Sequence, residues 1–178
     1  MKHTVTLTAK ELKLAEFVAK QRNDDGRSAG ADSNKYGNER PTYEVHLDGV
    51  LGELSFAKLM GMYWTGMGDS YQEDSDVANY QVRSTTYSNG CLIIRPNEGH
   101  EHDPWVLMIA EGNRKYRLAG WCYGWRGRQD KYRREPGGRP WAFFVPQPEL
   151  ESPESLRGWP SETSAARTPL EMPLPRWG

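Results

Sequence analysis

The amino-acid sequence predicts an α+β fold with a mixed central sheet flanked by helices. Two segments near the N-terminus carry apolar residues at helical spacing, and a series of strand-like apolar runs follows them. The 178 residues include 18 glycines and 12 prolines, which favours many turns over a helical bundle. This length suits a single domain, which we place at residues 1–150, followed by a proline-rich tail over 151–178.

The first helix is expected at residues 9–22. Thr8 and Glu11 have the spacing of a capping box, and apolar residues recur at helical spacing from Leu12 to Ala19. Residues 23–42 are rich in Gly, Ser, Asn and Asp without periodicity, which predicts a long loop.

The second helix is expected at about 49–61, with Asp48 as its cap and Gly61 at its end. Its apolar stripe runs from Val50 to Met60 and includes Glu53. A carboxylate in a core is costly unless it is paired or holds a metal ion. Glu53 is therefore the first residue that calls for a functional or ionic partner.

A chain of strands is expected after an acidic, glycine-rich connection at residues 62–75. Ser88–Gly90 has the composition of a hairpin turn between the first two strands, and Gly112–Asn113 of a turn between the third and fourth. The expected strands are about 77–85, 91–95, 105–111, 115–123 and 141–145, and the rest of the core spans 43–150.

Composition excludes membrane, secreted and fibrous classes. No apolar run approaches the roughly 20 residues that cross a bilayer, and the N-terminus lacks the apolar core of a signal peptide. Cys91 and Cys122 make no disulfide framework and are expected to be buried thiols, which favours a reduced, cytoplasmic protein.

The charge is unevenly distributed along the chain. The net charge is −1, yet nine basic residues lie between Arg114 and Arg139 against two acidic ones. A basic face interleaved with aromatic rings suits a nucleic acid, whereas a solvated arginine-rich loop is the alternative. Trp121 and Trp141 lie in apolar runs and are expected in the core. The candidate nucleic-acid-binding residues are Arg114, Lys115, Trp125, Arg126, Arg128, Lys131, Arg133 and Arg134.

Glu53, Asp76, Gln81 and Arg83 form the arrangement that could carry chemistry. Gln81 and Arg83 lie two apart on one expected strand, so they share a face. An amide oxygen can ligate a hard cation, and an arginine can grip a phosphate. Asp76 reaches the same face only if the chain bends at Ala78–Asn79. If it does not, an acid from the preceding connection takes its place: Asp69, Glu73 or Asp74.

The segment GVLGELSFAK at residues 49–58, Asp76, QVRST at 81–85 and GCLII at 90–94 together resemble the PD-(D/E)XK, restriction-endonuclease-like nuclease superfamily. More narrowly, they are similar to a group of small phage-borne proteins. The resemblance covers about residues 43–150.

The resemblance implies a Mg²⁺- or Mn²⁺-dependent nuclease acting on DNA in the host cytoplasm, with a homodimer as a further expectation. It makes Glu53 the helical acid that orients water and Asp76 a metal ligand. Gln81 stands at the acidic position of the motif, with the carbonyl of Val82 as a further ligand, and Arg83 stands at its lysine.

Two departures from the motif support an alternative. Gln81 removes one negative charge from the metal site, and Arg83 cannot act as a neutral base because an arginine side chain is not deprotonated in proteins. The alternative is a weakened or inactive nuclease-fold module that binds nucleic acid or a protein. Ordinary structural roles also stay open: a salt-bridged Glu53, a strand-start Asp76, and a solvated face for Gln81 and Arg83. The segment His100–Asp103 lacks zinc spacing and is expected to be a polar loop.

Overall fold

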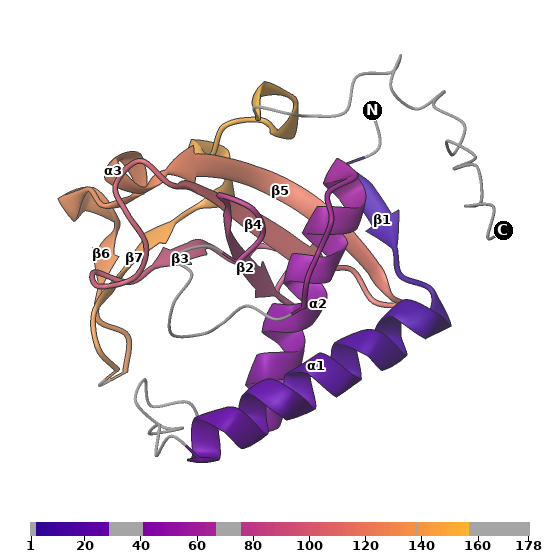
Figure 1. Ribbon diagram of the computed structural model, residues 1–178. Helices are drawn as coiled ribbons and strands as arrows, with labels where there is room; N and C mark the ends of the chain where they lie inside the picture. Colours follow the sequence, from indigo (N-terminus) through magenta and orange to yellow (C-terminus); the bar gives the residue numbers. More distant parts are fainter. Residues whose placement is uncertain (1–2, 29–40, 67–75, 138, 157–178) are drawn as a thin grey trace, which may run out of the picture.

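The computed structural model of this protein describes residues 3–28, 41–66, 76–137 and 139–156 (Figure 1). It has an α+β architecture with a mixed sheet, as predicted. The elements are, in order, β1 (Thr4–Thr6), α1 (Ala9–Ser28), α2 (Thr42–Met60), β2 (Gln81–Thr85), β3 (Leu92–Ile94), β4 (Pro104–Ala110), β5 (Lys115–Tyr123), α3 (Gly124–Gly127), η1 (Asp130–Tyr132), β6 (Arg133–Arg134), β7 (Ala142–Val145), η2 (Gln147–Glu149) and η3 (Pro153–Ser155).

Helix α1 begins at the predicted capping box and ends later than predicted. The Thr8 amide donates to Glu11 Oε2 at 2.6 Å, and the Glu11 amide donates to Thr8 Oγ1 at 3.2 Å. The helix continues through residues 23–28, for which the composition predicts a loop. Their weak helix propensity is overridden by tertiary contacts, because Arg22 is bound to α2 and Asn23 is buried.

Helix α2 is longer than predicted and begins at Thr42 rather than near residue 49. Pro41 stands at its N-cap, so Asp48 lies inside the helix and does not cap it. Tyr43 and Leu47 extend the buried stripe by two turns toward the N-terminus, which explains the earlier start. The predicted end at Gly61 is confirmed, and its φ of 66° is left-handed.

The larger sheet has the strand order β1-β5-β4-β2, with β2 at one edge. β4 pairs antiparallel with β5 and parallel with β2, so the sheet is mixed. The turn at Gly112–Asn113 therefore joins neighbouring strands, as predicted.

The hairpin predicted at Ser88–Gly90 is wrong as a strand pairing. The turn itself forms, since the Gly90 amide donates to the Tyr87 carbonyl at 2.9 Å. β3 leaves the turn for a second sheet with the order β3-β7-β6, where Leu92 and Ile94 are fully buried against β7. Burial of both side chains in this second core outweighs a local pairing with β2.

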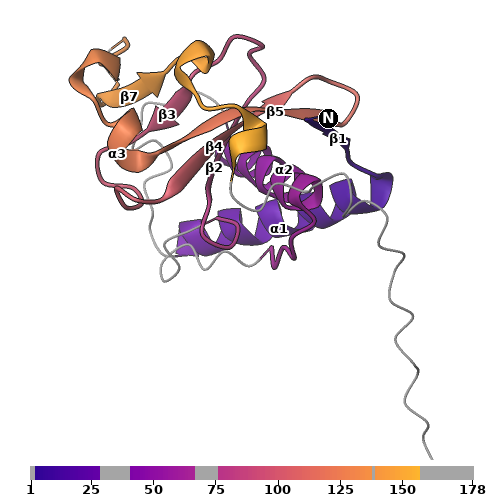
Figure 2. The same cartoon turned by 90° about the horizontal axis from the view of Figure 1, so that it is seen from above.

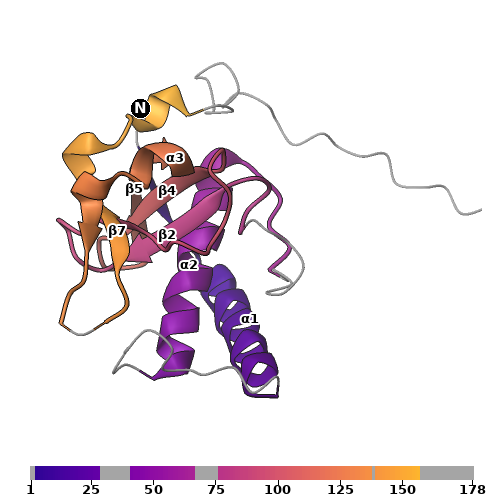
Figure 3. The same ribbon diagram turned by 90° about the vertical axis from the view of Figure 1, so that its left-hand side faces the viewer.

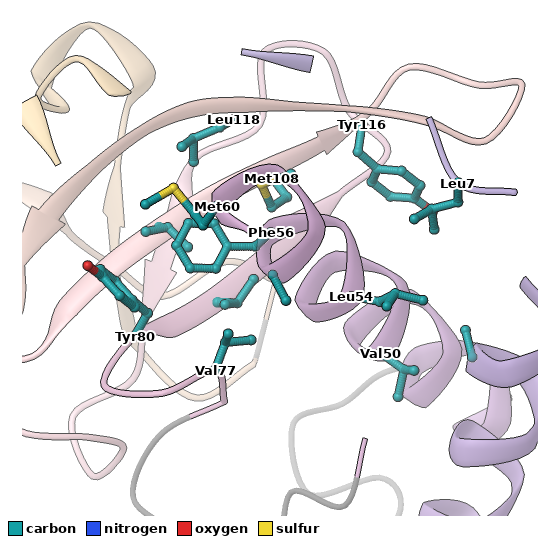
Figure 4. Close-up of a cluster of buried hydrophobic side chains, with 14 of the residues drawn as sticks. Leu7, Val50, Leu54, Phe56, Met60, Val77, Tyr80, Met108, Tyr116 and Leu118 are labelled. Atoms are coloured by element: carbon teal, nitrogen blue, oxygen red, sulfur yellow. The ribbon is translucent and has the colours of Figure 1, made fainter. Parts of the chain in front are cut away.

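Two hydrophobic clusters lie on opposite faces of the larger sheet. One contains Val50, Leu54 and Phe56 of α2 with Met108 and Leu118 of the sheet (Figure 4). The other fills the space between the two sheets. α1 packs on α2 rather than on the sheet itself, as Figure 3 shows from the side. Seen from above, the second sheet lies across the larger one from the helices (Figure 2).

Gly52 sets how closely α2 approaches β2. A Cβ atom at this position would lie 2.6 Å from Ser84 Cβ, so any larger residue would push helix and strand apart. One turn earlier, the Asp48 carbonyl accepts a hydrogen bond from Ser84 Oγ at 2.7 Å. This close approach brings Glu53, the residue after Gly52, beside the edge strand.

The first part of the predicted tail packs on the core. Trp121 Nε1 donates to Ser155 Oγ at 3.0 Å, and Leu156 is buried. Residues 157–178 lie outside the described residues, as do 29–40 of the predicted loop and 67–75 with Asp69, Glu73 and Asp74. In the described part of the chain, no helix has the length and apolar character to span a membrane.

Candidate functional site

A groove of about 670 Å³ lies between the N-terminal half of α2, the edge strand β2, and β3. We call it the site groove. Its charged lining comprises Asp48, Glu53 and Glu98 together with Arg83 and Arg95. Three of these five side chains are acidic, so the groove attracts cations unless they are neutralised within the protein.

Glu53 is the buried carboxylate that the helical pattern predicted. It is 5% exposed, and Arg22 of α1 holds it in a bidentate pair at 2.7 and 2.8 Å. Trp64 Nε1 donates to it at 3.3 Å. Burial raises the pKa of Glu53, the Arg22 guanidinium opposes that shift, and the nearby charge of Asp76 adds to it.

Asp76 reaches β2 through the bend that the sequence required at Ala78–Asn79. Val77 and Tyr80 form an isolated antiparallel bridge, and Ala78 between them has a φ of 50°. The bend places Asp76 Oδ2 2.8 Å from the Val82 amide and 3.2 Å from Arg83 Nη1. Asp76 therefore lies along the free edge of the strand, near Glu53.

Arg83 is fixed from several sides. Besides Asp76, it donates to Glu98 Oε2 at 2.8 Å and to the carbonyl of Val82 at 2.9 Å. Its guanidinium stacks 4.7 Å from the ring centroid of Trp105. Such a clamped guanidinium is oriented before any ligand arrives.

Gln81 does not join this group. Its side chain is 4% exposed, and its Nε2 lies 3.4 Å from Asp103 Oδ2. The residue pairs in register with the fully buried Trp105, so it points between the two sheets. The structure thus brings together Glu53, Asp76 and Arg83, with the main chain of Val82, and leaves the amide of Gln81 elsewhere.

Sequence reasoning missed two residues of the site, Arg22 and Glu98. Arg22 was recoverable in principle, because it continues the buried stripe of α1 one turn after Ala19. A base on one buried helical stripe and an acid on the next suggest an ion pair. Glu98 follows β3 in a loop, where no spacing rule places a side chain.

The basic stretch divides into two groups at opposite ends of β5. Arg114 and Lys115 lie at the turn before β5, where Lys115 pairs with Glu111 at 2.8 Å. The remaining members follow β5, near α3 and β6, at the far end of the strand (Figure 1). A nine-residue strand is roughly 30 Å long, so the two groups form no single patch.

Two arginines of the second group are tied to the protein itself. Arg126 pairs with Glu151, and the half-buried Arg128 donates to the carbonyls of Glu98 and Gly99. Arg128 also lies 5.8 Å from the ring centroid of Trp105, on which Arg83 stacks. These contacts favour a structural role for both. Trp121 is buried and Trp141 partly buried, as predicted.

The other cations of the second group face solvent. Arg133 stacks on Trp141 at 4.2 Å, and Arg134 donates to the carbonyls of Lys131 and Arg133. Lys131 pairs with Glu149 at 3.1 Å at the surface. Trp125, also exposed, lies on α3. Among the residues that the structure describes, no carboxylate pairs with Arg133 or Arg134, whose contacts are with main-chain carbonyls and an aromatic ring.

A second hollow of about 570 Å³ lies beside these cations. Its charged lining comprises Lys131 and Arg134 together with Glu135 and Glu149, and we call it the basic hollow after the exposed arginines next to it. Cys91 and Phe144 line both the basic hollow and the site groove. The two depressions therefore adjoin at these residues, and we call them together the concave surface, with the Glu53 ion pair at one end and the exposed arginines at the other.

The donor set at the acidic end fits Mg²⁺ in chemical type. Proteins hold this ion through one or two carboxylates, and water and substrate phosphates supply the remaining ligands. Glu53 and Asp76 are two such carboxylates, and the nearby charge of Asp76 adds to the burial that raises the pKa of Glu53. Arg22 competes with a cation for Glu53. No cluster of three or more His, Cys, Asp or Glu is present within the described ranges.

Searches of protein-family models, of curated proteins and of solved structures find no match for this chain.

Proposed function

We propose that this chain is a metal-dependent nuclease that hydrolyses DNA phosphodiester bonds in the site groove. One observation carries the proposal: Glu53 and Arg83 line a groove, Asp76 is bonded to Arg83 beside it, and the groove adjoins a depression with exposed arginines. A polynucleotide is a ligand that would extend along both parts. The resemblance of the surrounding sequence to phage-borne nucleases of the PD-(D/E)XK superfamily supports the same reaction.

Each residue of the site would have a separate role in phosphodiester hydrolysis. Glu53 and Asp76 would hold Mg²⁺, which supplies a Lewis acid and lowers the pKa of a bound water. Arg83 would grip the phosphate through its planar guanidinium and stabilise the negative charge that develops there. Asp76 and Glu98 orient its guanidinium. Arg133 and Arg134 attract the flanking phosphates.

A plasmid-nicking assay with Mg²⁺ and with Mn²⁺ tests the proposal. Asp76→Asn keeps the size of the side chain but removes its charge, so cleavage should fall by about 100-fold or more while DNA affinity changes little. Asp76 is half-buried, which makes misfolding a small concern, and a thermal melt checks it. Glu111→Gln is the matched control, because Glu111 pairs with Lys115 and Arg117 and does not line the groove. Equal nicking by wild type and Asp76→Asn would refute the assignment.

A second candidate is a nuclease-fold module that binds DNA without cutting it. The specific observation in its favour is that Arg22 occupies both oxygens of Glu53, while the amide of Gln81 lies away from the groove. In this case the wild-type protein shifts DNA in an electrophoretic assay but leaves plasmid intact with either metal. Nicking that depends on Asp76 excludes this candidate.

A further inference from the structure

The turn between β2 and β3 presents a large aromatic ring to solvent. Tyr87 is 73% exposed and lines the site groove. An exposed tyrosine on a loop without internal hydrogen bonds would not indicate a binding site, since single apolar side chains are common on protein surfaces. The turn that carries Tyr87 is not loose.

Four hydrogen bonds hold the turn. Within it, the Tyr87 amide donates to Thr85 Oγ1 at 3.2 Å, and the Gly90 amide donates to the Tyr87 carbonyl at 2.9 Å. From outside, Gln147 Nε2 donates to the carbonyls of Ser88 at 2.9 Å and Gly90 at 3.0 Å. A side chain from beyond β7 thus anchors the turn, and the ring of Tyr87 is presented on a rigid support.

Gly90 makes this tight turn possible. A Cβ atom there would lie 2.6 Å from Thr85 Cγ2 and 3.1 Å from the Tyr87 carbonyl oxygen. Only glycine fits at position 90 without displacing Thr85 or the Tyr87 carbonyl. The tight turn therefore depends on Gly90, and that turn fixes the position of Tyr87.

The surroundings of Tyr87 suit a nucleotide. The amide of Asn89 lines the same groove and can bond to the edge of a base. Phe144 is a second aromatic ring on the path, at the junction with the basic hollow. Arg134 lies beyond it and is the cation that the phosphates of an extended strand would meet. Lys131, which lines the same hollow, is paired with Glu149. Rings and cations along one groove are the usual means of holding unpaired strands.

We propose that Tyr87 is a stacking platform for an unpaired base, so that the nucleic acid taken by the site groove is single-stranded at this point. The inference deepens the proposed function and rests on it. In a duplex both faces of a base are covered by its neighbours, so the ring could not stack there without unpairing the strand. A single strand offers its bases directly.

Fluorescence anisotropy with end-labelled oligonucleotides tests the platform. The probes are oligothymidylate, oligouridylate and an abasic oligodeoxynucleotide of the same length. Tyr87→Ala should weaken binding of a base-containing strand by about tenfold, and Tyr87→Phe should restore it, because stacking needs the ring and not the hydroxyl. Tyr63→Ala is the matched control, since Tyr63 is 89% exposed and lies outside both depressions.

The abasic strand separates stacking from electrostatics. Tyr87→Ala and wild type should bind it equally, because it offers phosphates but no ring. An equal loss on the abasic strand, or no loss on either base-containing strand that the wild type binds, overturns the platform and leaves the proposed function standing. If the wild type binds none of the oligonucleotides and no duplex, the proposed function itself fails.

Discussion

The two ends of the concave surface handle charge in opposite ways. At the Glu53 end, acids and arginines are buried or half-buried and matched within the protein, as in the pairs of Glu53 with Arg22 and of Arg83 with Asp76. At the basic end, six cations lie between residues 126 and 139 against two acids, and most of them face solvent.

Charged residues at the two ends therefore affect different properties of the protein: folding stability at the Glu53 end and attraction of a polyanion at the basic end. A buried pair costs desolvation and is strongly destabilising to break, so its members fix the positions of α1, α2 and β2. Exposed cations contribute little to folding and much to long-range attraction of a polyanion. Substitutions that break the buried pair at the first end should therefore act through stability, and those of exposed cations at the second end through binding.

The largest effect is expected from breaking the buried pair. Arg22→Ala leaves Glu53 charged and buried without its partner, which should lower the free energy of unfolding by about 3–5 kcal/mol. Urea denaturation followed by circular dichroism measures it. Lys131→Ala is the control at the other end, since it breaks a fully exposed pair and should leave the midpoint unchanged.

A double variant tests whether the lost stability comes from the uncompensated charge of Glu53. Arg22→Met with Glu53→Leu replaces both charges with apolar side chains, so no charge is left uncompensated. It should recover most of the stability that Arg22→Ala loses, although it removes a residue that the proposed reaction requires. If Arg22→Ala and Lys131→Ala had equal effects, the contrast between the two ends would be wrong.

The elements of the fold were largely predictable because each depends on local pattern. The capping box of α1, the left-handed Gly61, the turn at Gly112–Asn113 and the bend at Ala78–Asn79 all follow from short-range chemistry. The predictions that are wrong concern features that depend on tertiary contacts. α1 runs past its expected end because Arg22 pairs with Glu53 of α2 and Asn23 is buried. β3 leaves β2 because a second sheet offers its side chains greater burial.

The candidate site was predictable only in part, for the same reason. Helical periodicity predicts that Glu53 is buried, and Arg22 on the buried stripe of α1 could have been inferred as its partner, whereas no spacing rule places Glu98. Alternation along β2 showed that Gln81 and Arg83 share a face. It could not show that the long arginine side chain reaches the strand edge while the shorter glutamine stays between the sheets, against Asp103.

Gln81→Glu tests that placement. If the side chain faced the metal ligands, the added charge would tighten Mg²⁺ binding. Beside Asp103 and almost fully buried, it should instead lower the free energy of unfolding at pH 7 by about 2 kcal/mol and leave Mg²⁺ affinity unchanged. Burial and the neighbouring carboxylate favour the protonated acid, so the loss should disappear as the pH falls below about 4. Titration calorimetry with Mg²⁺ decides between the two placements.

The salt dependence of DNA binding tests the basic end. Replacing Arg133, Arg134 and Arg139 with alanine should reduce the slope of log affinity against log salt by about 0.7–0.9 for each phosphate that is no longer neutralised. The matched control replaces Arg114, Lys115 and Arg117 at the other end of β5, where no change in slope is expected. If both triple variants reduced the slope equally, the number of cations rather than their position would determine the attraction of DNA.

The smallest effect is expected at Cys91, where the two depressions meet. Cys91 is half-buried and lines both of them, whereas Cys122 is 1% exposed and burial raises its pKa to about 12. At pH 8 only about one in 10⁴ of the Cys122 side chains is the thiolate that alkylating agents attack. Iodoacetamide should therefore modify Cys91 first, as peptide mapping can show, and Cys91→Ser should remove that reaction.

A strand that occupies both depressions must pass over Cys91, which lines both of them, so a saturating oligonucleotide should slow the alkylation of Cys91 several-fold. Oligonucleotide binding that leaves the alkylation rate unchanged would place the strand on only one of the two ends, and the two ends would then act separately.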